Sequence, residues 1–362
     1  MSLFKPKPKS ILGIDIGTSS IKVVQLKKEE DKFKLESYGE LSTIGYLERL
    51  NDSFQITSFK KLEVVTREML KILIERSKIT ANNTVMAIPI FSSFVSVIEM
   101  PEMGEKELER SIEFEARRYI PIPLTEVVFD WKVLDQGMIK DDVVKKPFNG
   151  KRILIIAVPK EVVNKYMRIA EALGLKINAL ELESFSLGRS LITDSKSSAC
   201  ILDIGARATS FLIVDKGTVQ MSHSLDTAGA EMTKNLATGL GITQVRAEEL
   251  KTTFGLNHES DAGSRHEFKE LLNISVDKII TEIDRMINNY QSKTNRKIEK
   301  LILNGGSAKL IGISDYIEKK LNIKAVVADP WLKIIYPPML QETLKEIGPQ
   351  FSVTVGAAMR EN

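Results

Sequence analysis

The chain has 362 residues, enough for two medium-sized domains or one large unit of two lobes. Hydrophobic residues make up 43% of the sequence and charged residues 27%, which is ordinary for a globular protein with a real core. The 51 basic and 48 acidic side chains give a net charge of +3. The near-equal numbers of basic and acidic side chains argue against a nucleic-acid-binding protein, which usually carries a concentrated basic surface.

The single cysteine and the first residues of the chain bear on its location. Cys200 has no second cysteine with which to form an internal disulfide, which fits a reducing compartment. No apolar run approaches the ~18 residues that cross a bilayer, and the aspartate and glycines of ILGIDIG interrupt any signal-like segment. We interpret Lys5, Lys7 and Lys9 as a solvated tail, with weak attraction to an anionic membrane surface as the alternative. The sequence therefore predicts a cytoplasmic protein that reaches a membrane only through partners.

The first predicted elements are three strands that carry an Asp-Ile-Gly turn. Residues 9–41 contain an apolar strand, the turn DIGTSS, a second apolar strand, a charged turn and a third strand. Gly17 lets the backbone turn tightly and approach an anion, and Asp15 at the strand end is placed to hold a hydrated magnesium ion. The candidate cofactor-binding residues of this turn are Asp15, Gly17, Thr18, Ser19, Ser20 and Lys22.

A helix and a strand at about residues 62–90 lead to a strand-helix-strand unit at residues 94–134. Its helix ends at the two prolines of YIPIP, so the chain beyond presents a rigid apolar edge. This edge is a candidate partner-binding segment, and the alternative is that it buries the core of the unit itself. Its residues are Tyr119, Ile120, Pro121, Ile122 and Pro123.

After another helix at about residues 163–173, the three-strand pattern returns at residues 198–225. Asp203 follows Asp15 by 188 positions, about half of the chain, which predicts two similar lobes rather than a short-period solenoid. Strands mixed with helices in this way predict an α/β fold. One Asp-Ile-Gly is a weak signal, but two copies in matched contexts indicate phosphate loops, against the alternative of two ordinary hairpins. The candidate cofactor-binding residues of the second turn are Asp203, Gly205 and Thr209.

The last predicted elements include a helix at about residues 244–254 and a strand at residues 300–303 that runs into a glycine pair. The two turns, followed by LILNGGSAKLIGISDYI, resemble the phosphate and adenosine motifs of the actin, chaperone and sugar-kinase superfamily. The segment AEELK resembles the family helix whose Glu and Lys contact ribose and adenine, although it is equally an exposed charged helix face. The resemblance assigns nucleotide contacts to Glu248, Lys251, Gly305, Gly306 and Ser307.

This resemblance implies an actin-like fold, a duplicated ribonuclease H-like unit with two lobes, and ATP or ADP with Mg²⁺ between them. Asp15 and Asp203 would hold the Mg²⁺ through water. In active relatives the second loop has further glycines and then an acidic residue, whereas this chain reads DIGARATS. Glu183 matches the acidic residue that orients water in catalytic relatives, but Ser184 replaces the proline that follows it. We therefore expect nucleotide binding with weak or no ATPase activity.

The unit at residues 94–134 is similar to the SHS2-type insertion of the PilM family and of its division relative FtsA, and EFEARRYIPIP is close to the PilM pattern in particular. This resemblance extends over nearly the whole chain. It implies an adaptor of type IV pilus assembly at the cytoplasmic face of the inner membrane. The N-terminal cytoplasmic segment of PilN would lie in a groove between the first lobe and the insertion, and the pilus motor ATPase and the platform protein would be further partners.

The same resemblance implies a division of the chain. The parts are residues 1–92 of the first lobe, an insertion at 93–182, a connecting helix at 183–197, a second lobe at 198–345 with a helical subdomain at about 241–300, and a C-terminal helix at 346–362 that returns to the first lobe. Two alternatives remain open. One is an FtsA-like division or cytoskeletal protein, although the ending FSVTVGAAMREN does not look like a membrane-binding helix. The other is a turnover ATPase or phosphotransferase, for which no acid/base aspartate stands out.

Overall fold

The computed structural model describes residues 10–43, 56–134, 150–194, 196–256 and 264–361, with the backbone alone at residues 56–62 and 264–266. Lys5, Lys7 and Lys9 lie outside the described residues. The chain divides into two compact units. The first unit comprises Met1–Pro89, Glu161–Thr193 and Asp329–Asn362, and the second comprises Ile90–Lys160 and Asp194–Ala328.

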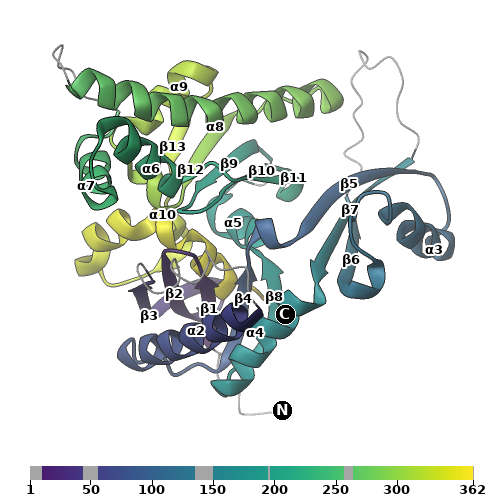
Figure 1. The fold of residues 1–362 in the computed structure, drawn as a ribbon. Coiled ribbons are helices and arrows are strands. Elements are labelled where there is room, and N and C mark those ends of the chain that lie inside the picture. Colours follow the sequence, from purple (N-terminus) through teal and green to yellow (C-terminus); the bar gives the residue numbers. More distant parts are fainter. Residues whose placement is uncertain (1–9, 44–55, 135–149, 195, 257–263, 362) are drawn as a thin grey trace. The chain divides into compact units, whose positions relative to one another are not determined.

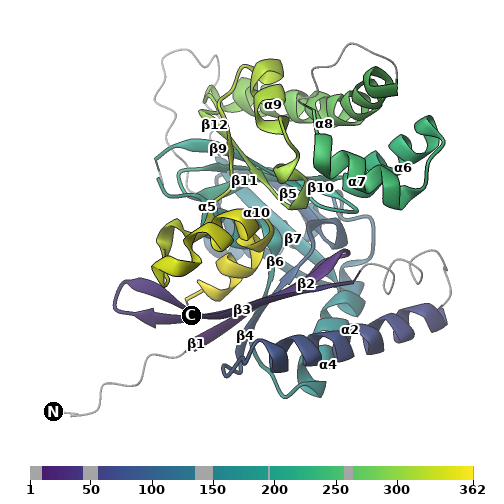
Figure 2. The same cartoon turned by 90° about the vertical axis from the view of Figure 1, so that its left-hand side faces the viewer.

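The first unit is built on a six-stranded sheet with helices on both faces (Figures 1 and 2). Its strand order is β14-β3-β2-β1-β4-β8. The strands are β1 (Ser10–Ile16), β2 (Ser20–Glu29), β3 (Lys32–Ser42), β4 (Asn83–Ile88), β8 (Lys176–Leu182) and β14 (Ile334–Ile335). The helices are α2 (Ile56–Arg76), α4 (Lys160–Ala172), α5 (Glu183–Leu191) and α10 (Gln341–Ala358).

The side chains of β1 and β2 alternate between two cores, as expected for a strand buried on both faces. Ile14 and Val23 join the core under α2 and α4, whereas Val24 joins the core under α10 with Trp331 and Phe351.

Two glycines let α10 approach its neighbours closely. A Cβ at Gly13 of β1 would lie 2.2 Å from the carbonyl oxygen of Thr354, and a Cβ at Gly356 would lie 1.9 Å from that of Ser186 in α5. Helix α10 therefore packs backbone to backbone against both β1 and α5, a contact that only glycine permits.

The second unit contains a five-stranded sheet of order β11-β10-β9-β12-β13. Its strands are β9 (Ser198–Ile204), β10 (Thr209–Asp215), β11 (Thr218–Leu225), β12 (Lys300–Asn304) and β13 (Ala325–Val327). The long helix α8 (Ser264–Thr294) supplies apolar side chains, among them Ile279 and Ile283, to the core beside this sheet. The other helices are α6 (Gly229–Leu240), α7 (Gln244–Phe254) and α9 (Ile313–Leu321).

The two sheets repeat one topology. In both, the first three strands form an antiparallel meander, and the next two lie parallel to the first strand on its other side. The order β3-β2-β1-β4-β8 thus corresponds to β11-β10-β9-β12-β13. Asp15 and Asp203 occupy equivalent positions, each opposite a residue at the start of its second strand, Lys22 and Ser210. The prediction of a duplicated actin-like α/β fold is confirmed.

The insertion is a three-stranded antiparallel sheet with one helix on its apolar face. Its elements are β5 (Phe94–Pro101), α3 (Glu105–Ala116), β6 (Val127–Val133) and β7 (Gly150–Pro159). Residues 161–182, which the predicted range 93–182 includes, lie instead in the first unit. The reason is strand pairing: β8 lies parallel to β4, with Leu182 opposite Ile88, and α4 buries Tyr166 and Ile169 in the core of the first unit.

Within the described residues, no helix is long and apolar enough to span a membrane.

Candidate functional site

The two Asp-Ile-Gly turns have the same backbone geometry. The amide of Gly17 donates to the carbonyl of Ser20 at 3.1 Å, and the amide of Gly205 donates to that of Ala208 at 3.1 Å. A Cβ at either glycine would lie 2.9 Å from the carbonyl oxygen that its own amide contacts. Any other residue would therefore open the turn, and this is the physical reason for glycine at both positions.

Thr43, just after β3, forms two hydrogen bonds to the backbone of the first turn. Its amide donates to the carbonyl of Ser19 at 2.9 Å, and its hydroxyl donates to the carbonyl of Thr18 at 2.7 Å. These bonds occupy the carbonyls of Thr18 and Ser19 and fix the backbone of the turn. Thr43 was not among the predicted residues, because its link to the turn depends on the pairing of β2 with β3.

Asp15 is a buried carboxylate, and one of its oxygens has no hydrogen-bond partner among the described residues. Its side chain is 8% exposed, and its Oδ1 has no hydrogen-bond partner among the described residues. Burial raises the pKa of Asp15, while the charge of Lys22 lowers it and that of Glu40 raises it further. The ammonium of Lys22 donates to Ser20 Oγ at 2.5 Å and pairs with Glu40 at 3.5 Å. An unpartnered buried carboxylate oxygen beside a glycine turn fits a hydrated cation.

The second carboxylate, Asp203, is held by the glycine-pair segment. Asn304 Nδ2 donates to Asp203 Oδ1 at 2.8 Å, and the Oδ1 of Asn304 is itself buried with no partner among the described residues. Gly305 has φ +84°, and a Cβ there would lie 2.6 Å from Asp203 Oδ1. A side chain at position 305 would therefore collide with the protein itself, whereas a Cβ at Gly306 would meet no atom of the described residues within 4 Å apart from its chain neighbours.

Thr209 and Lys251 are buried and form hydrogen bonds within the protein. The buried hydroxyl of Thr209 donates to the carbonyl of Thr227 at 2.6 Å. The buried ammonium of Lys251 donates to the Gly229 carbonyl at 3.0 Å, to Thr233 Oγ1 at 2.8 Å and to Glu248 at 2.7 Å. Thr233 also donates to the Glu248 carboxylate. Lys251 of α7 therefore links this helix to the start of α6 by hydrogen bonds. In this cluster, the side chain of Glu248 is half exposed to solvent.

Gly229, which the sequence analysis did not single out, joins the predicted residues of the second unit. Its amide donates to the Gly205 carbonyl at 3.0 Å, and a Cβ on it would lie 2.7 Å from Ser307 Oγ and 3.8 Å from Lys251 Nζ. The structure thus brings together Gly205, Ser307, Lys251 and the start of α6. The glycine directly before the helical run AEMTKNLA was the available signal.

Glu183, the predicted water-orienting residue, begins α5 in the first unit. Burial raises the pKa of the Tyr166 hydroxyl, and the negative charges of Glu183 and Asp15 raise it further. Both carboxylates therefore act on the same tyrosine. Ser184, at the position of the family proline, is buried, and its hydroxyl has no partner among the described residues.

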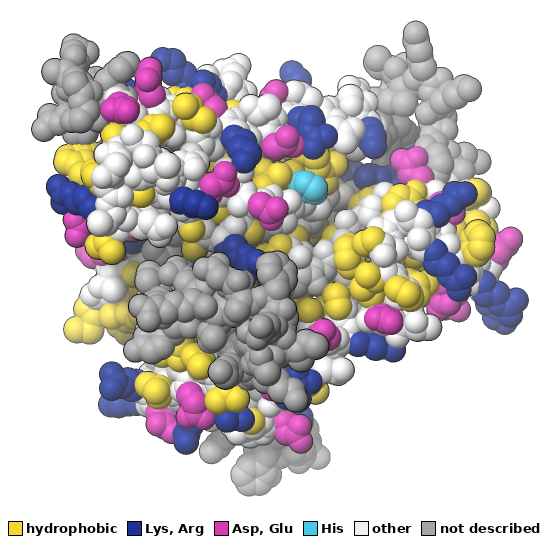
Figure 3. All heavy atoms as spheres, viewed as in Figure 1, with side chains coloured by type: hydrophobic (Ala, Val, Ile, Leu, Met, Phe, Trp, Pro, Cys, Tyr) yellow, Lys and Arg dark blue, Asp and Glu magenta, His cyan; other side chains and the backbone are white. Residues whose placement is uncertain are grey.

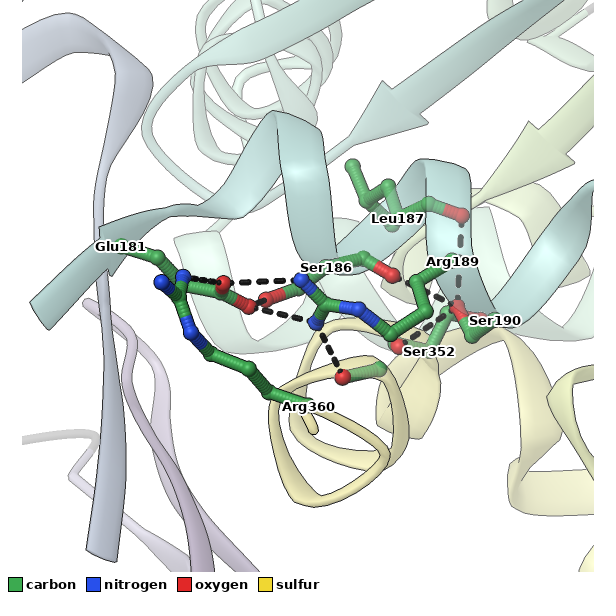
Figure 4. Close-up of polar contacts among 8 residues, drawn as sticks. Glu181, Ser186, Leu187, Arg189, Ser190, Ser352 and Arg360 are labelled. Atoms are coloured by element: carbon green, nitrogen blue, oxygen red, sulfur yellow. Dashed lines mark hydrogen bonds and ion pairs between the residues drawn. The ribbon is translucent and has the colours of Figure 1, made fainter. Parts of the chain in front are cut away.

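The carboxylate two residues earlier, Glu181, is the centre of an ion network (Figure 4). Arg189 contacts its two oxygens at 2.7 and 2.9 Å, Arg360 donates at 2.5 Å and Ser186 at 2.6 Å. Arg189 also donates to the carbonyl of Gly356, so the network joins β8, α5 and the end of α10. Burial alone would raise the pKa of Glu181, but the hydrogen bonds from Arg189, Ser186 and Arg360 outweigh it and hold the pKa below 4.5.

The predicted partner-binding segment borders a cavity of 420 Å³ in the second unit. Tyr119 and Ile120 line it, with Tyr119 46% exposed and Ile120 buried. Ile122 packs against the core of the insertion, and Pro121 and Pro123 are exposed. Figure 3 shows hydrophobic side chains exposed over the insertion on this face of the molecule.

The wall of the cavity away from the insertion belongs to β11, through Ser222, His223 and Ser224. The groove between the insertion and the first lobe stays a prediction. The cavity described here is lined by residues of the second unit, among them residues of β11, the end strand of its sheet.

Comparisons with known proteins agree with this architecture. A solved PilM-PilN type IV pilus biogenesis complex superposes with a TM-score of 0.79 at 23% identity, covering 98% of this chain and 99% of that one. MreB5 of Spiroplasma citri bound to ADP superposes with a TM-score of 0.52 at 13% identity, over 97% and 95% of the two chains. The cell division protein FtsA of Staphylococcus epidermidis is 23% identical over 385 residues, covering 93% of this chain and 78% of FtsA. The family model described as type IV pilus assembly protein PilM matches residues 13–362. The chain therefore belongs to the PilM family of type IV pilus assembly proteins.

Proposed function

We propose that this protein is an ATP-binding adaptor of the type IV pilus assembly platform, which binds the N-terminal cytoplasmic segment of a PilN protein. Membership of the PilM family supports the role in pilus assembly, and the likeness to a PilM-PilN complex supports the partner. The observation that carries the proposal is the cavity bordered by Tyr119 and Ile120, because it places a site with both apolar and polar lining beside the predicted partner-binding segment. Through PilN the protein would sit at the inner membrane and connect it to the pilus motor ATPase and the platform protein.

The nucleotide proposal rests on two matched turns. Gly17 and Gly205 form the same type of turn, and within the described part of the chain one buried oxygen of Asp15 has no partner and a Cβ at Gly306 would meet no atom beyond its chain neighbours. We propose that ATP binds with its phosphates at these turns and its adenosine near Glu248, Gly306 and Ser307, and that Mg²⁺ is held through water by Asp15 and Asp203. A magnesium ion bound there would neutralise phosphate charge.

A synthetic peptide copying the cytoplasmic start of PilN from the same organism is expected to bind with micromolar or better affinity, about 8 kcal/mol. Tyr119→Ala should weaken binding about tenfold and leave the melting temperature unchanged, because the ring is half exposed at the cavity. Ile120→Ala is the matched core control and should lower stability by about 2–5 kcal/mol. Calorimetric titration and thermal melting measure both quantities.

A parallel loss of affinity and stability in Tyr119→Ala would favour the alternative that the segment only buries the insertion. If a folded, ATP-loaded protein bound no platform peptide at all, the adaptor proposal would be wrong and the fold would stand.

ATP turnover is expected to be far below the ~10 per second that is typical of enzymes. The second turn reads DIGARATS, and Ser184 takes the place of the family proline after Glu183. Glu183→Ala should leave nucleotide affinity unchanged and remove only residual phosphate release, measured by a coupled assay at steady state. A wild-type rate near the enzymatic value would favour the turnover ATPase over the adaptor.

An FtsA-like role in division is the second candidate, since an FtsA shares 23% identity over 93% of this chain. A pull-down that captures division proteins and no pilus platform protein would support it.

A further inference from the structure

Asn304, the last residue of β12, is buried, and only one end of its side-chain amide is used. The residue is 2% exposed, and its Nδ2 donates to Asp203 Oδ1 at 2.8 Å. Its Oδ1 is buried and has no hydrogen-bond partner among the described residues. The amide cannot be turned over, because its oxygen would then face a carboxylate oxygen and both are acceptors. A buried polar atom without a partner is costly, so this oxygen is a candidate acceptor for a ligand.

The place of Asn304 follows from strand pairing. In the second sheet β12 lies parallel to β9, and Asn304 is directly opposite Asp203. The amide and the carboxylate therefore lie side by side at the ends of the two strands, on the same face of the sheet. The backbone of the next residue closes on the same carboxylate oxygen, since a Cβ at Gly305 would lie 2.6 Å from Asp203 Oδ1. Asp203 Oδ1 is thus already in contact with the protein, and the acceptor left beside it is Asn304 Oδ1.

The equivalent position in the first sheet is Ala87. Strand β4 corresponds to β12, and Ala87 is directly opposite Asp15 just as Asn304 is opposite Asp203. Alanine has no polar side chain to offer, and Asp15 Oδ1 has no partner among the described residues. In the first unit the unpartnered oxygen therefore belongs to the carboxylate itself, whereas in the second unit it belongs to the asparagine beside the carboxylate.

An oxygen of this kind needs a ligand that donates a hydrogen bond. The oxygens of an ionised phosphate only accept, so they are not suitable partners for Asn304 Oδ1. Mg²⁺ keeps several waters when it binds to proteins, and the outer side of these waters presents hydrogens. The ribose hydroxyls of a nucleotide are donors as well. The carboxylate of Asp203 favours the first source, because its negative charge attracts a cation whereas ribose is neutral.

We propose that Asn304 is a positioning residue of the magnesium site. Its Nδ2 orients Asp203, and its Oδ1 accepts a hydrogen bond from a water bound to Mg²⁺. The inference rests on the proposed binding of Mg-ATP and adds a residue to it. Removal of the amide should therefore weaken nucleotide binding only when Mg²⁺ is present.

The test is nucleotide binding by the full chain with and without Mg²⁺. Asn304→Leu approximately keeps the volume of the side chain and removes both of its hydrogen-bonding groups. Asn304→Ala removes the same groups and leaves out the larger side chain, in case leucine does not fit. Calorimetric titration with ATP in millimolar Mg²⁺ should show an affinity about tenfold lower than that of the wild type for both variants. With ATP and a chelator of Mg²⁺, the variants should bind as the wild type does.

Asn273→Ala is the matched control. Asn273 lies on α8, and its Oδ1 is likewise buried without a partner among the described residues. This variant should keep the Mg-ATP affinity of the wild type, because the residue is not part of the strand ends that carry the turns. Melting curves of the nucleotide-free variants show whether each of them is folded.

The outcomes separate the magnesium role of Asn304 from the nucleotide proposal. A loss of affinity that depends on Mg²⁺, in the Asn304 variants and not in Asn273→Ala, supports the inference. An equal loss with and without Mg²⁺ would assign the amide to the ribose and overturn the magnesium role. Unchanged Mg-ATP affinity in a folded Asn304 variant also overturns it and leaves the nucleotide proposal intact. A wild type that binds no ATP under either condition would overturn both.

Discussion

Replacing Glu181 with alanine is expected to lower the free energy of unfolding by about 3 kcal/mol. The carboxylate is almost fully buried, and two arginines and a serine bond to it across three elements of the first unit. Breaking a buried ion pair typically costs about 3–5 kcal/mol, because the remaining charge is left without its partner. The lower value of this range applies here, because the side chains of Arg189 and Arg360 are 27% and 40% exposed. After the substitution, water can solvate both guanidinium groups.

The measurement can be confined to the first unit. In a Trp131→Phe background, the fluorescence of Trp331, buried in the core under α10, reports unfolding of this unit. Glu68→Ala is the control in the same unit, since it removes an exposed pair with Arg67 and should cost less than about 1 kcal/mol. Equal stability of Glu181→Ala and Glu68→Ala would show that the network contributes nothing.

The same network predicts a pH dependence. The folded-state pKa of Glu181 is held below its ordinary value of 4.5, so the unfolded chain takes up the proton first as pH falls. The stabilisation is fully present above about 4.5 and is lost as pH falls through the lower folded-state pKa. The stability difference between the wild type and Glu181→Gln should therefore shrink below pH 4.5 and be constant near neutrality.

Asp15→Asn is expected to abolish stabilisation by Mg-ATP without lowering the stability of the nucleotide-free protein. At a ligand concentration 100-fold above the dissociation constant, binding stabilises the wild type by about 2.7 kcal/mol. Burial raises the pKa of Asp15, so the ionised carboxylate opposes folding at neutral pH, and the neutral amide removes this cost. The variant should thus melt at the same temperature as the wild type or higher, and Mg-ATP should not shift it.

Asp31→Asn, on the exposed turn between β2 and β3, is the matched control and should retain the full shift. Thermal melting of nucleotide-stripped protein with and without millimolar Mg-ATP measures both effects. A wild type that does not respond, or an Asp15→Asn variant that responds fully, would contradict the assignment of Asp15. Gly305→Val is a poor substitute, because its Cβ would collide with Asp203 whether or not nucleotide is bound.

The turns could be predicted from the sequence because their cause is local. Each is closed by a hydrogen bond between residues three positions apart, and glycine is required by an atom within the same turn. The repeat of this pattern at half the chain length then implied the duplicated fold, which the two equivalent sheets confirm. The apolar alternation of the strands pointed in the same direction.

The boundary of the insertion required the tertiary structure. Residues 161–182 have the helix and strand pattern of either neighbour, and only the pairing of β8 with β4 assigns them to the first unit. Strand pairing over so long a separation in the chain leaves no trace in local periodicity.

The roles of individual side chains likewise depended partly on the sequence alone and partly on the tertiary structure. The sequence by itself determined where the glycine turns lie, which carboxylates end their strands and which apolar segment follows α3, since these depend on neighbours along the chain. Only the tertiary structure decided that Lys251 is buried against Gly229, that Glu181 rather than Glu183 holds the ion network, and that β11 forms a wall of the cavity beside Tyr119. In each case the residues that interact lie on different elements, so their burial and their contacts arise only when those elements pack together.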